Sequence, residues 1–145
     1  MATTKRKQTI RELMTSDPVV LDASATVSDA ARAMKARDIG DVLVRRDGKL
    51  VGIVTDRDLV VRAIADDPQG AGRIALGDIC TTDIASVSPD TEIDEAIRLM
   101  REKAVRRLPV VEDARPLGIL SLGDLAVARD RESALGDISA APPTR

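Results

Sequence analysis

The chain has 145 residues, of which 43% are hydrophobic and 32% charged, with a net charge of −2, values typical of a globular domain. The small net charge argues against broad nucleic-acid binding, because non-specific binding to a polyanion requires a concentrated basic surface. The chain has no histidine, one cysteine and no aromatic residue, which excludes histidine-based catalysis, a cysteine zinc cluster and ring stacking on a nucleobase.

Hydrophobic periodicity and turn residues predict the elements of the first half of the chain. In order, they are a flexible start at 1–8, a short helix at 10–14, a turn at 15–18, a strand at 19–21, a helix from Thr26, strands at 42–44 and 50–54, and a helix at 56–65. Thr26 and Asp29 have the spacing of a capping box, and Asp47-Gly48 is a typical tight hairpin turn.

The same order of elements then restarts. It comprises a linker at 67–74, a helix at 76–80, a strand at 85–87, a helix at 93–100, strands at 108–111 and 117–120, a helix at 122–131 and a flexible tail at 132–145. Residues 13–59 align with residues 79–125 at a constant offset of 66, with 11 identities in 47 positions. We therefore expect an α/β fold of two β-α-β-β-α repeats, 9–66 and 75–131. Packing of the two sheets about a pseudo-twofold axis would create a pair of clefts.

The duplicated segments GIVTDRDL (52–59) and GILSLGDL (118–125) carry the chemistry that we single out. Thr55 and Ser121 each follow a strand and open a helix, where free N–H groups and the helix dipole favour an anion. Asp58 and Asp124 lie three residues further on, and a carboxylate there can accept both hydroxyls of a ribose. The same spacing is also that of a simple helix cap, so capping and ligand binding both remain open.

Order, spacing and duplication make the chain resemble the CBS domain pair, or Bateman module, over residues 10–130. The stretches that carry the resemblance are Met14-Thr15 with Pro18-Val19, Ala30 with Met34, residues 52–59, Ala96 with Met100, residues 105–111, and residues 118–125. The chain is most similar to small stand-alone bacterial pairs, including the mycobacterial hypoxic-response type. The resemblance implies binding of AMP, ADP, ATP or S-adenosylmethionine, and self-association into flat homodimers.

The resemblance also implies roles for individual residues. The hydroxyls of Thr55 and Ser121 would contact phosphate or ribose, and the carboxylates of Asp58 and Asp124 would accept ribose hydroxyls. Arg106 and Arg107 precede Leu-Pro-Val, where the family places phosphate-binding residues, although a plain surface pair is the alternative.

The first repeat has Gly40-Asp41 at the position of these arginines, and the acidic side chain should repel phosphate. Arg57 is a candidate to compensate, and a solvated helix face is its alternative reading. Val20 and Ile84 lie in the short strands where the family holds the base, which here would contact only aliphatic groups. We therefore expect two unequal clefts, with tight binding in at most one.

The favoured hypothesis is a regulatory module that binds an adenine nucleotide in the cleft between the repeats and signals to an unidentified protein partner. Mg²⁺ would arrive only with a polyphosphate, and we expect no tightly bound cofactor, no dedicated metal site and no enzyme activity. The alternative is a structural or interaction dimer whose clefts bind no nucleotide. We expect a cytoplasmic protein without nucleic-acid or membrane partners, and contact surfaces around Leu59-Val60-Ala63 and Leu125-Ala126.

Overall fold

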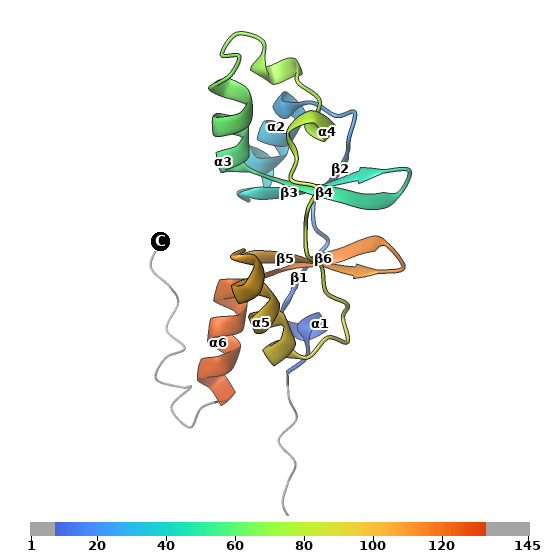
Figure 1. Cartoon of the computed structure of the whole chain (residues 1–145), viewed down its shortest axis with the longest axis vertical. Helices are drawn as coiled ribbons and strands as arrows, with labels where there is room; N and C mark the ends of the chain where they lie inside the picture. The colour runs from blue at the N-terminus through green and yellow to red at the C-terminus, as the bar shows by residue number, and fades with distance from the viewer. Residues whose placement is uncertain (1–7, 133–145) are drawn as a thin grey trace, which may run out of the picture. The chain divides into compact units, whose positions relative to one another are not determined.

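The computed structural model describes residues 8–132 of the chain (Figure 1). The predicted flexible ends, 1–8 and 132–145, thus lie outside the described residues except for Gln8 and Glu132. Contacts divide the chain into two compact units. The first-sheet unit contains residues 17–84 and 112–117, and the second-sheet unit contains the described residues before 17, residues 85–111, and those from 118 onward.

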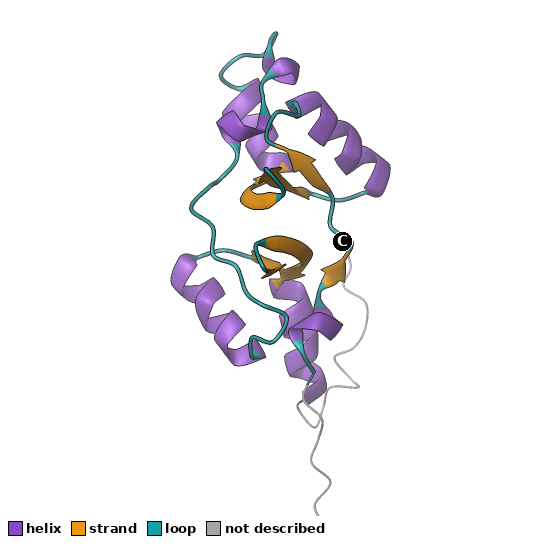
Figure 2. Ribbon diagram, turned by 90° about the vertical axis from the view of Figure 1, so that its right-hand side faces the viewer, coloured by secondary structure: helices purple, strands orange, loops and turns teal. Residues whose placement is uncertain are grey.

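The first-sheet unit is a three-stranded sheet with its helices on one face (Figures 1 and 2). Strand β2 (Val20–Asp22) is parallel to β3 (Asp41–Arg46), which is antiparallel to β4 (Lys49–Thr55). The predicted hairpin turn is confirmed, because Asp47 and Gly48 both have positive φ, at 54° and 77°. The mixed parallel and antiparallel order places the starts of β2 and β3 and the end of β4 at the same end of the sheet.

Helix α2 (Val27–Arg37) supplies the inner face of this unit. Its predicted capping box is confirmed, since Thr26 Oγ1 accepts the Asp29 N–H at 3.2 Å and the Asp29 carboxylate accepts the Thr26 N–H at 2.9 Å. Val27, Ala30 and Met34 are buried against the sheet, as their spacing predicts.

The helix after β4 begins as α3 (Asp56–Asp58) and continues as a π-helix, η1 (Leu59–Ile64). Leu59 and Ala63 are buried in the core, whereas Val60, Val61 and Ile64 are exposed. The expectation that Leu59 and Ala63 form an outward contact surface is therefore wrong. A short 3-10 helix, η2 (Ala71–Arg73), follows within the predicted linker.

The second-sheet unit also has a three-stranded sheet, but its order is β1-β6-β5, with β1 antiparallel to the central strand β6. Its elements are β1 (Thr15–Ser16), helix α5 (Ile93–Lys103), β5 (Arg107–Glu112), β6 (Arg115–Ser121) and helix α6 (Leu122–Glu132). The helices again cover one face of the sheet (Figure 1). Leu125 at the start of α6 is buried, so its expected place on an exposed contact surface is also wrong.

The strand predicted at 85–87 is reduced to one bridge, between Val87 and Val110. In the first-sheet unit the Leu43 N–H extends the equivalent ladder by donating to the Val19 carbonyl at 2.9 Å. The residue aligned with Leu43 is Pro109, which has no N–H to donate. The ladder therefore stops at Val87.

The short helix that leads each sequence repeat packs in the unit that contains the sheet of the other repeat. Ile10 of α1 (Ile10–Leu13) is buried among residues of the second-sheet unit, from Val87 to Leu125. Leu76 and Ile79 of α4 (Leu76–Ile79) belong to the core of the first-sheet unit. Division by contact thus differs from division by sequence repeat, and the boundaries 9–66 and 75–131 stay a prediction.

A glycine in each sheet makes this exchange of leading segments sterically feasible. A Cβ on Gly52 would lie 2.6 Å from Cys80 Sγ and 2.9 Å from the Thr81 carbonyl oxygen. A Cβ on Gly118 would lie 2.7 Å from both Met14 Sδ and the Thr15 carbonyl oxygen. All four distances are shorter than the Cβ contacts that proteins show, so close packing explains why both aligned positions are glycine.

Candidate functional site

The first motif turn lies where β4 ends and α3 begins. Thr55 is the N-cap: its Oγ1 accepts the Asp58 N–H at 3.1 Å, and Asp58 Oδ2 accepts the Thr55 N–H at 2.9 Å. Only one of these bonds is accepted by the carboxylate, at Oδ2, and the Thr55 hydroxyl retains its own proton for donation.

The second motif turn, between β6 and α6, has the same pair of bonds. The Ser121 N–H donates to Asp124 Oδ2 at 3.0 Å, and the Asp124 N–H donates to Ser121 Oγ at 3.1 Å. All four side chains are partly buried. Helix capping is therefore real in both copies, and the sequence brought each hydroxyl–carboxylate pair together as predicted.

The residues at the start of the strand next to each turn, β3 in one unit and β5 in the other, give the two motifs different charges. In the first-sheet unit Asp41 is the register partner of Thr55, and the Gly40 carbonyl accepts the Asp56 N–H at 3.0 Å. In the second-sheet unit the Arg106 carbonyl accepts the Leu122 N–H at 2.8 Å. Arg106 and the adjacent Arg107 thus flank the second turn with two exposed cationic side chains.

Arg62 was missed by the sequence reasoning, although it lies close to the first turn. Its Nε is 3.6 Å from Asp58 Oδ1, and its Nη1 donates to the Ile79 carbonyl at 3.1 Å. The signal available was the i, i+4 spacing of aspartate and arginine. Arg57, the predicted compensating cation, is exposed at the start of the helix, with its backbone N–H bonded to Asp56 Oδ1 at 2.8 Å.

The two residues expected to hold a base both belong to the first-sheet unit. Val20 is half-buried at the start of β2, at the end of the sheet where Thr55 lies. Ile84 is half-buried in an irregular segment that follows the pairing of Thr81 with Ile53. The structure thus groups Val20 with the first turn, and it places Ile84 outside any strand.

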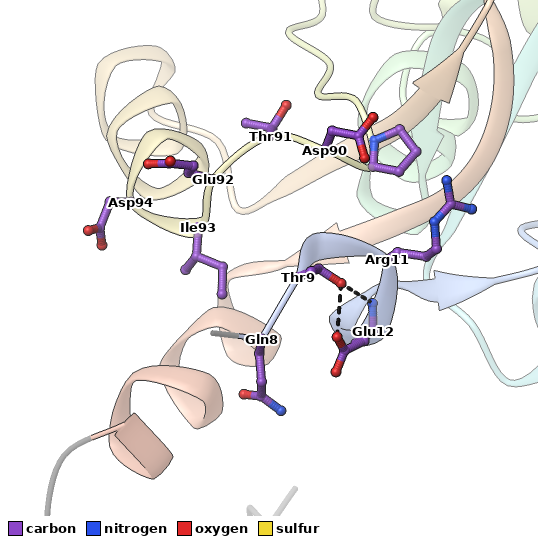
Figure 3. A pocket seen from close by; sticks show the side chains of 10 residues that line it. Gln8, Thr9, Arg11, Glu12, Asp90, Thr91, Glu92, Ile93 and Asp94 are labelled. Atoms are coloured by element: carbon purple, nitrogen blue, oxygen red, sulfur yellow. Dashed lines mark hydrogen bonds between the residues drawn. The ribbon is translucent and has the colours of Figure 1, made fainter. Parts of the chain in front are cut away.

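Two cavities within the second-sheet unit have no residue of either motif turn in their lining. The larger, of about 520 Å³, lies between the start of α1 and the start of α5 (Figure 3). Its lining includes the hydrogen-bonded pair Thr9 and Glu12, while the Asp94 carboxylate points away from that pair (Figure 3). A smaller cavity of about 200 Å³ is lined by residues 86–88 and by one side of α5. The sequence predicted neither cavity.

Residues 8–132 contain neither a cluster of metal ligands nor a helix that could span a membrane. In that range no three histidine, cysteine or acidic side chains cluster so as to hold a metal ion. None of the helices described there combines the length and the apolar character required to cross a bilayer.

Comparison with known proteins gives a consistent result. The CBS domain family model matches residues 10–64 and 76–131. Among curated relatives, the uncharacterized protein YlbB of Bacillus subtilis is 40% identical over 136 residues, covering 90% of each chain. Hypoxic response protein 1 of Mycobacterium tuberculosis is 32% identical over 121 residues, covering 81% of this chain and 82% of the relative.

Solved structures show the same fold. Hypoxic Response Protein I, whose structure holds two coordinated zinc ions, is 30% identical with a TM-score of 0.72, over 82% of this chain and 97% of that one. The CBS-domain protein ATU1752 of Agrobacterium tumefaciens is 27% identical with a TM-score of 0.74, over 89% and 98%. The chain belongs to the CBS domain family and carries a pair of CBS domains, a regulatory module with a mixed α/β fold.

Proposed function

We propose that the chain senses adenine nucleotides, binding AMP, ADP, ATP or S-adenosylmethionine at its motif turns and signalling to a protein partner. It acts in the cytoplasm as a homodimer, without enzyme activity or a tightly bound cofactor. The observation that carries the proposal is the doubled turn, in which Thr55 with Asp58 and Ser121 with Asp124 make the same pair of bonds.

The turn suits a nucleoside phosphate because capping leaves acceptor capacity on the aspartate. A carboxylate has about four lone-pair sites, and the cap uses the Asp124 Oδ2 atom. The two hydroxyls of a ribose can then donate to Asp124, while phosphate oxygens lie near the helix N-terminus. Arg106 and Arg107 are long enough to pair with phosphate in a bidentate manner.

The charges around the turns make the second turn the tighter site. Asp41 beside the first turn repels phosphate, and Arg62 already lies against Asp58 Oδ1. The residue aligned with Arg62 in the second repeat is Ala128. The nucleotide therefore meets two cations at the second turn and an acidic neighbour at the first.

One solved structural relative bears on the ligand class. The CBS domain pair of protein MJ0100 was solved with 5-methylthioadenosine and S-adenosyl-L-methionine, and it has a TM-score of 0.76 and 21% identity to this chain. At that identity the likeness concerns the fold, and the two ligands bound to that protein support adenosine compounds as the class to test here.

A second candidate function, a structural dimer that binds no nucleotide, is favoured by one observation. Helix capping alone accounts for every hydrogen bond described at the Thr55–Asp58 and Ser121–Asp124 pairs. Under this alternative the motif aspartates contribute to helix stability and to nothing else.

Isothermal titration with AMP, ADP, ATP and S-adenosylmethionine separates the two functions. Asp124→Asn retains an oxygen for the cap but loses the charged acceptor, so we expect binding to weaken by about 10- to 100-fold. Asp29→Asn is the matched control, because Asp29 forms the same capping box with Thr26 away from the motif turns. Absence of heat with every ligand, or equal loss in both variants, would reject nucleotide sensing.

A further inference from the structure

Arg62 connects two elements of the first-sheet unit that are distant in sequence. Its guanidinium lies 3.6 Å from Asp58 Oδ1 through Nε and donates to the Ile79 carbonyl at 3.1 Å through Nη1. Ile79 is the last residue of α4, so its carbonyl is one that the helix itself leaves without a partner. One side chain thus bridges the motif aspartate and the end of α4.

The π-helix accounts for the position of Arg62. In η1 the Ala65 N–H bonds to the Val60 carbonyl, five residues back, and the wider turn brings residues four apart into line. Leu59 and Ala63 therefore share the buried face. In the regular helix α6 the buried alanine is instead Ala128, which aligns with Arg62. The wider π-helical turn therefore places Ala63 on the buried face and leaves Arg62 exposed.

The segment that Arg62 holds is closely packed against β4. Cys80 follows Ile79, and its sulfur lies where a Cβ on Gly52 would be only 2.6 Å away. Thr81 then exchanges two backbone hydrogen bonds with Ile53, of 2.9 and 3.1 Å. A displacement at the end of α4 therefore also displaces the Cys80 thiol and the edge of the sheet in which Thr55 lies.

We propose that Arg62 is a positioning residue that couples the occupancy of Asp58 to the packing of the segment 79–81. The ligand part of this inference rests on the proposed nucleotide binding. The Asp58 side chain is 18% exposed and that of Arg62 is 48% exposed, so a ligand can reach both.

Competition for these two side chains supplies the coupling. Ribose hydroxyls on Asp58 displace the guanidinium from Oδ1, and a phosphate anion draws the guanidinium toward itself. Either event weakens the bond to the Ile79 carbonyl and loosens the chain around Cys80. The aligned Ala128 has no side chain able to do this, so the same ligand at the second turn leaves Cys80 unaffected.

The single cysteine of the chain is a built-in reporter for this coupling. We would measure the rate at which iodoacetamide alkylates Cys80 in wild-type protein and in Arg62→Lys, which retains a positive charge near the thiol. Arg57→Lys, on the same helix, is the matched control. We expect alkylation to be about tenfold faster in Arg62→Lys, the factor for one charge-assisted hydrogen bond, and unchanged in Arg57→Lys. Circular dichroism melting verifies that both variants fold.

Added nucleotide supplies the second arm of the experiment. Saturating ADP is expected to accelerate Cys80 alkylation in wild-type protein and in Asp124→Asn, and to have no effect in Asp58→Asn. A Cys80 alkylation rate in Arg62→Lys equal to that in wild type overturns the coupling. An alkylation rate that ADP leaves unchanged in Asp124→Asn, when calorimetry shows that this variant still binds ADP, overturns it as well. If no nucleotide binds but Arg62→Lys still loosens Cys80, the proposed function fails while the positioning role of Arg62 stands.

Discussion

The exchange of leading segments can be tested most sharply at Gly118. In Gly118→Ala the new Cβ would lie 2.7 Å from the Thr15 carbonyl oxygen, and that oxygen belongs to β1, which pairs with β6. Met14 Sδ, also at 2.7 Å, is the end of a flexible side chain and can move. The backbone oxygen cannot move without disturbing the pairing of Thr15 with Ile119. The strand must therefore shift, or β1 must detach.

Overpacking of this kind costs roughly 1 to 3 kcal/mol, and replacement of a strand glycine by alanine returns about 0.5 to 1 kcal/mol. We expect a net loss of about 1 to 2 kcal/mol in the free energy of unfolding for Gly118→Ala. Gly52→Ala should be similar, because the Thr81 carbonyl oxygen lies 2.9 Å from its added Cβ. Gly123→Ala is the control: its Cβ finds only Ser121 Oγ, at 3.7 Å, and the helix should gain about 0.5 kcal/mol.

Urea unfolding followed by far-ultraviolet circular dichroism is the appropriate assay, because the chain has no aromatic residue to report by fluorescence. The two variants Gly118→Ala and Gly123→Ala should move the midpoint in opposite directions. Equal or greater stability of Gly118→Ala relative to wild type would refute the close approach of the leading segment to β6.

Three further predictions concern Cys80, Asp29 and Thr26. Burial raises the pKa of the Cys80 thiol, so the pH midpoint of its alkylation should lie above that in urea; coincident midpoints would contradict this. The hydrogen bond from the Thr26 N–H, and then that from Arg32, lowers the pKa of Asp29. The stability that the Asp29 carboxylate contributes is therefore present above pH ~4 and is lost as the pH falls through the folded-state pKa. The difference in unfolding free energy between wild type and Asp29→Asn should disappear in acid, and a difference independent of pH would contradict this prediction. Thr26→Ala removes the cap of α2 and should cost about 1 kcal/mol in urea unfolding, whereas an unchanged midpoint would mean that the cap is not formed.

Local sequence patterns predicted those elements that depend on interactions between residues close in sequence. The spacing of Val27, Ala30 and Met34 fixed the buried face of α2, and the Asp47-Gly48 pair fixed the hairpin turn. The α/β class followed from the order of the predicted strands and helices, and the family from the resemblance of the duplicated motifs, which the sequence by itself already shows.

The differences arise from tertiary contacts that no local pattern encodes. Thr15-Ser16 reads as a turn but forms β1, because β6 offers an edge for it to pair with. The missing N–H of Pro109 shortens the strand expected at 85–87, a signal that was present in the sequence and not used.

The sequence predicted the hydroxyl–aspartate pairs of the candidate site, which occur in both repeats. It did not predict Arg62, which occurs beside the first pair and has no counterpart beside the second. Spacing alone placed each hydroxyl beside its aspartate. The role of Arg62 depends on the π-helical register of η1, in which Ala63 is buried. In the regular helix α6 the buried alanine is Ala128, which aligns with Arg62. A regular helical period predicts the contact of Arg62 with Asp58 but not its hydrogen bond to the Ile79 carbonyl, 17 residues away in sequence.

The most direct measurement is a titration of the isotope-labelled protein with ADP, followed by the backbone amide resonances. We expect the amides of residues 121–124 to shift most at low ADP, and those of residues 55–58 to follow at higher concentration. Amides that shift only around the 520 Å³ cavity, such as those of residues 91–93, or resonances that do not move at all, would contradict this expectation.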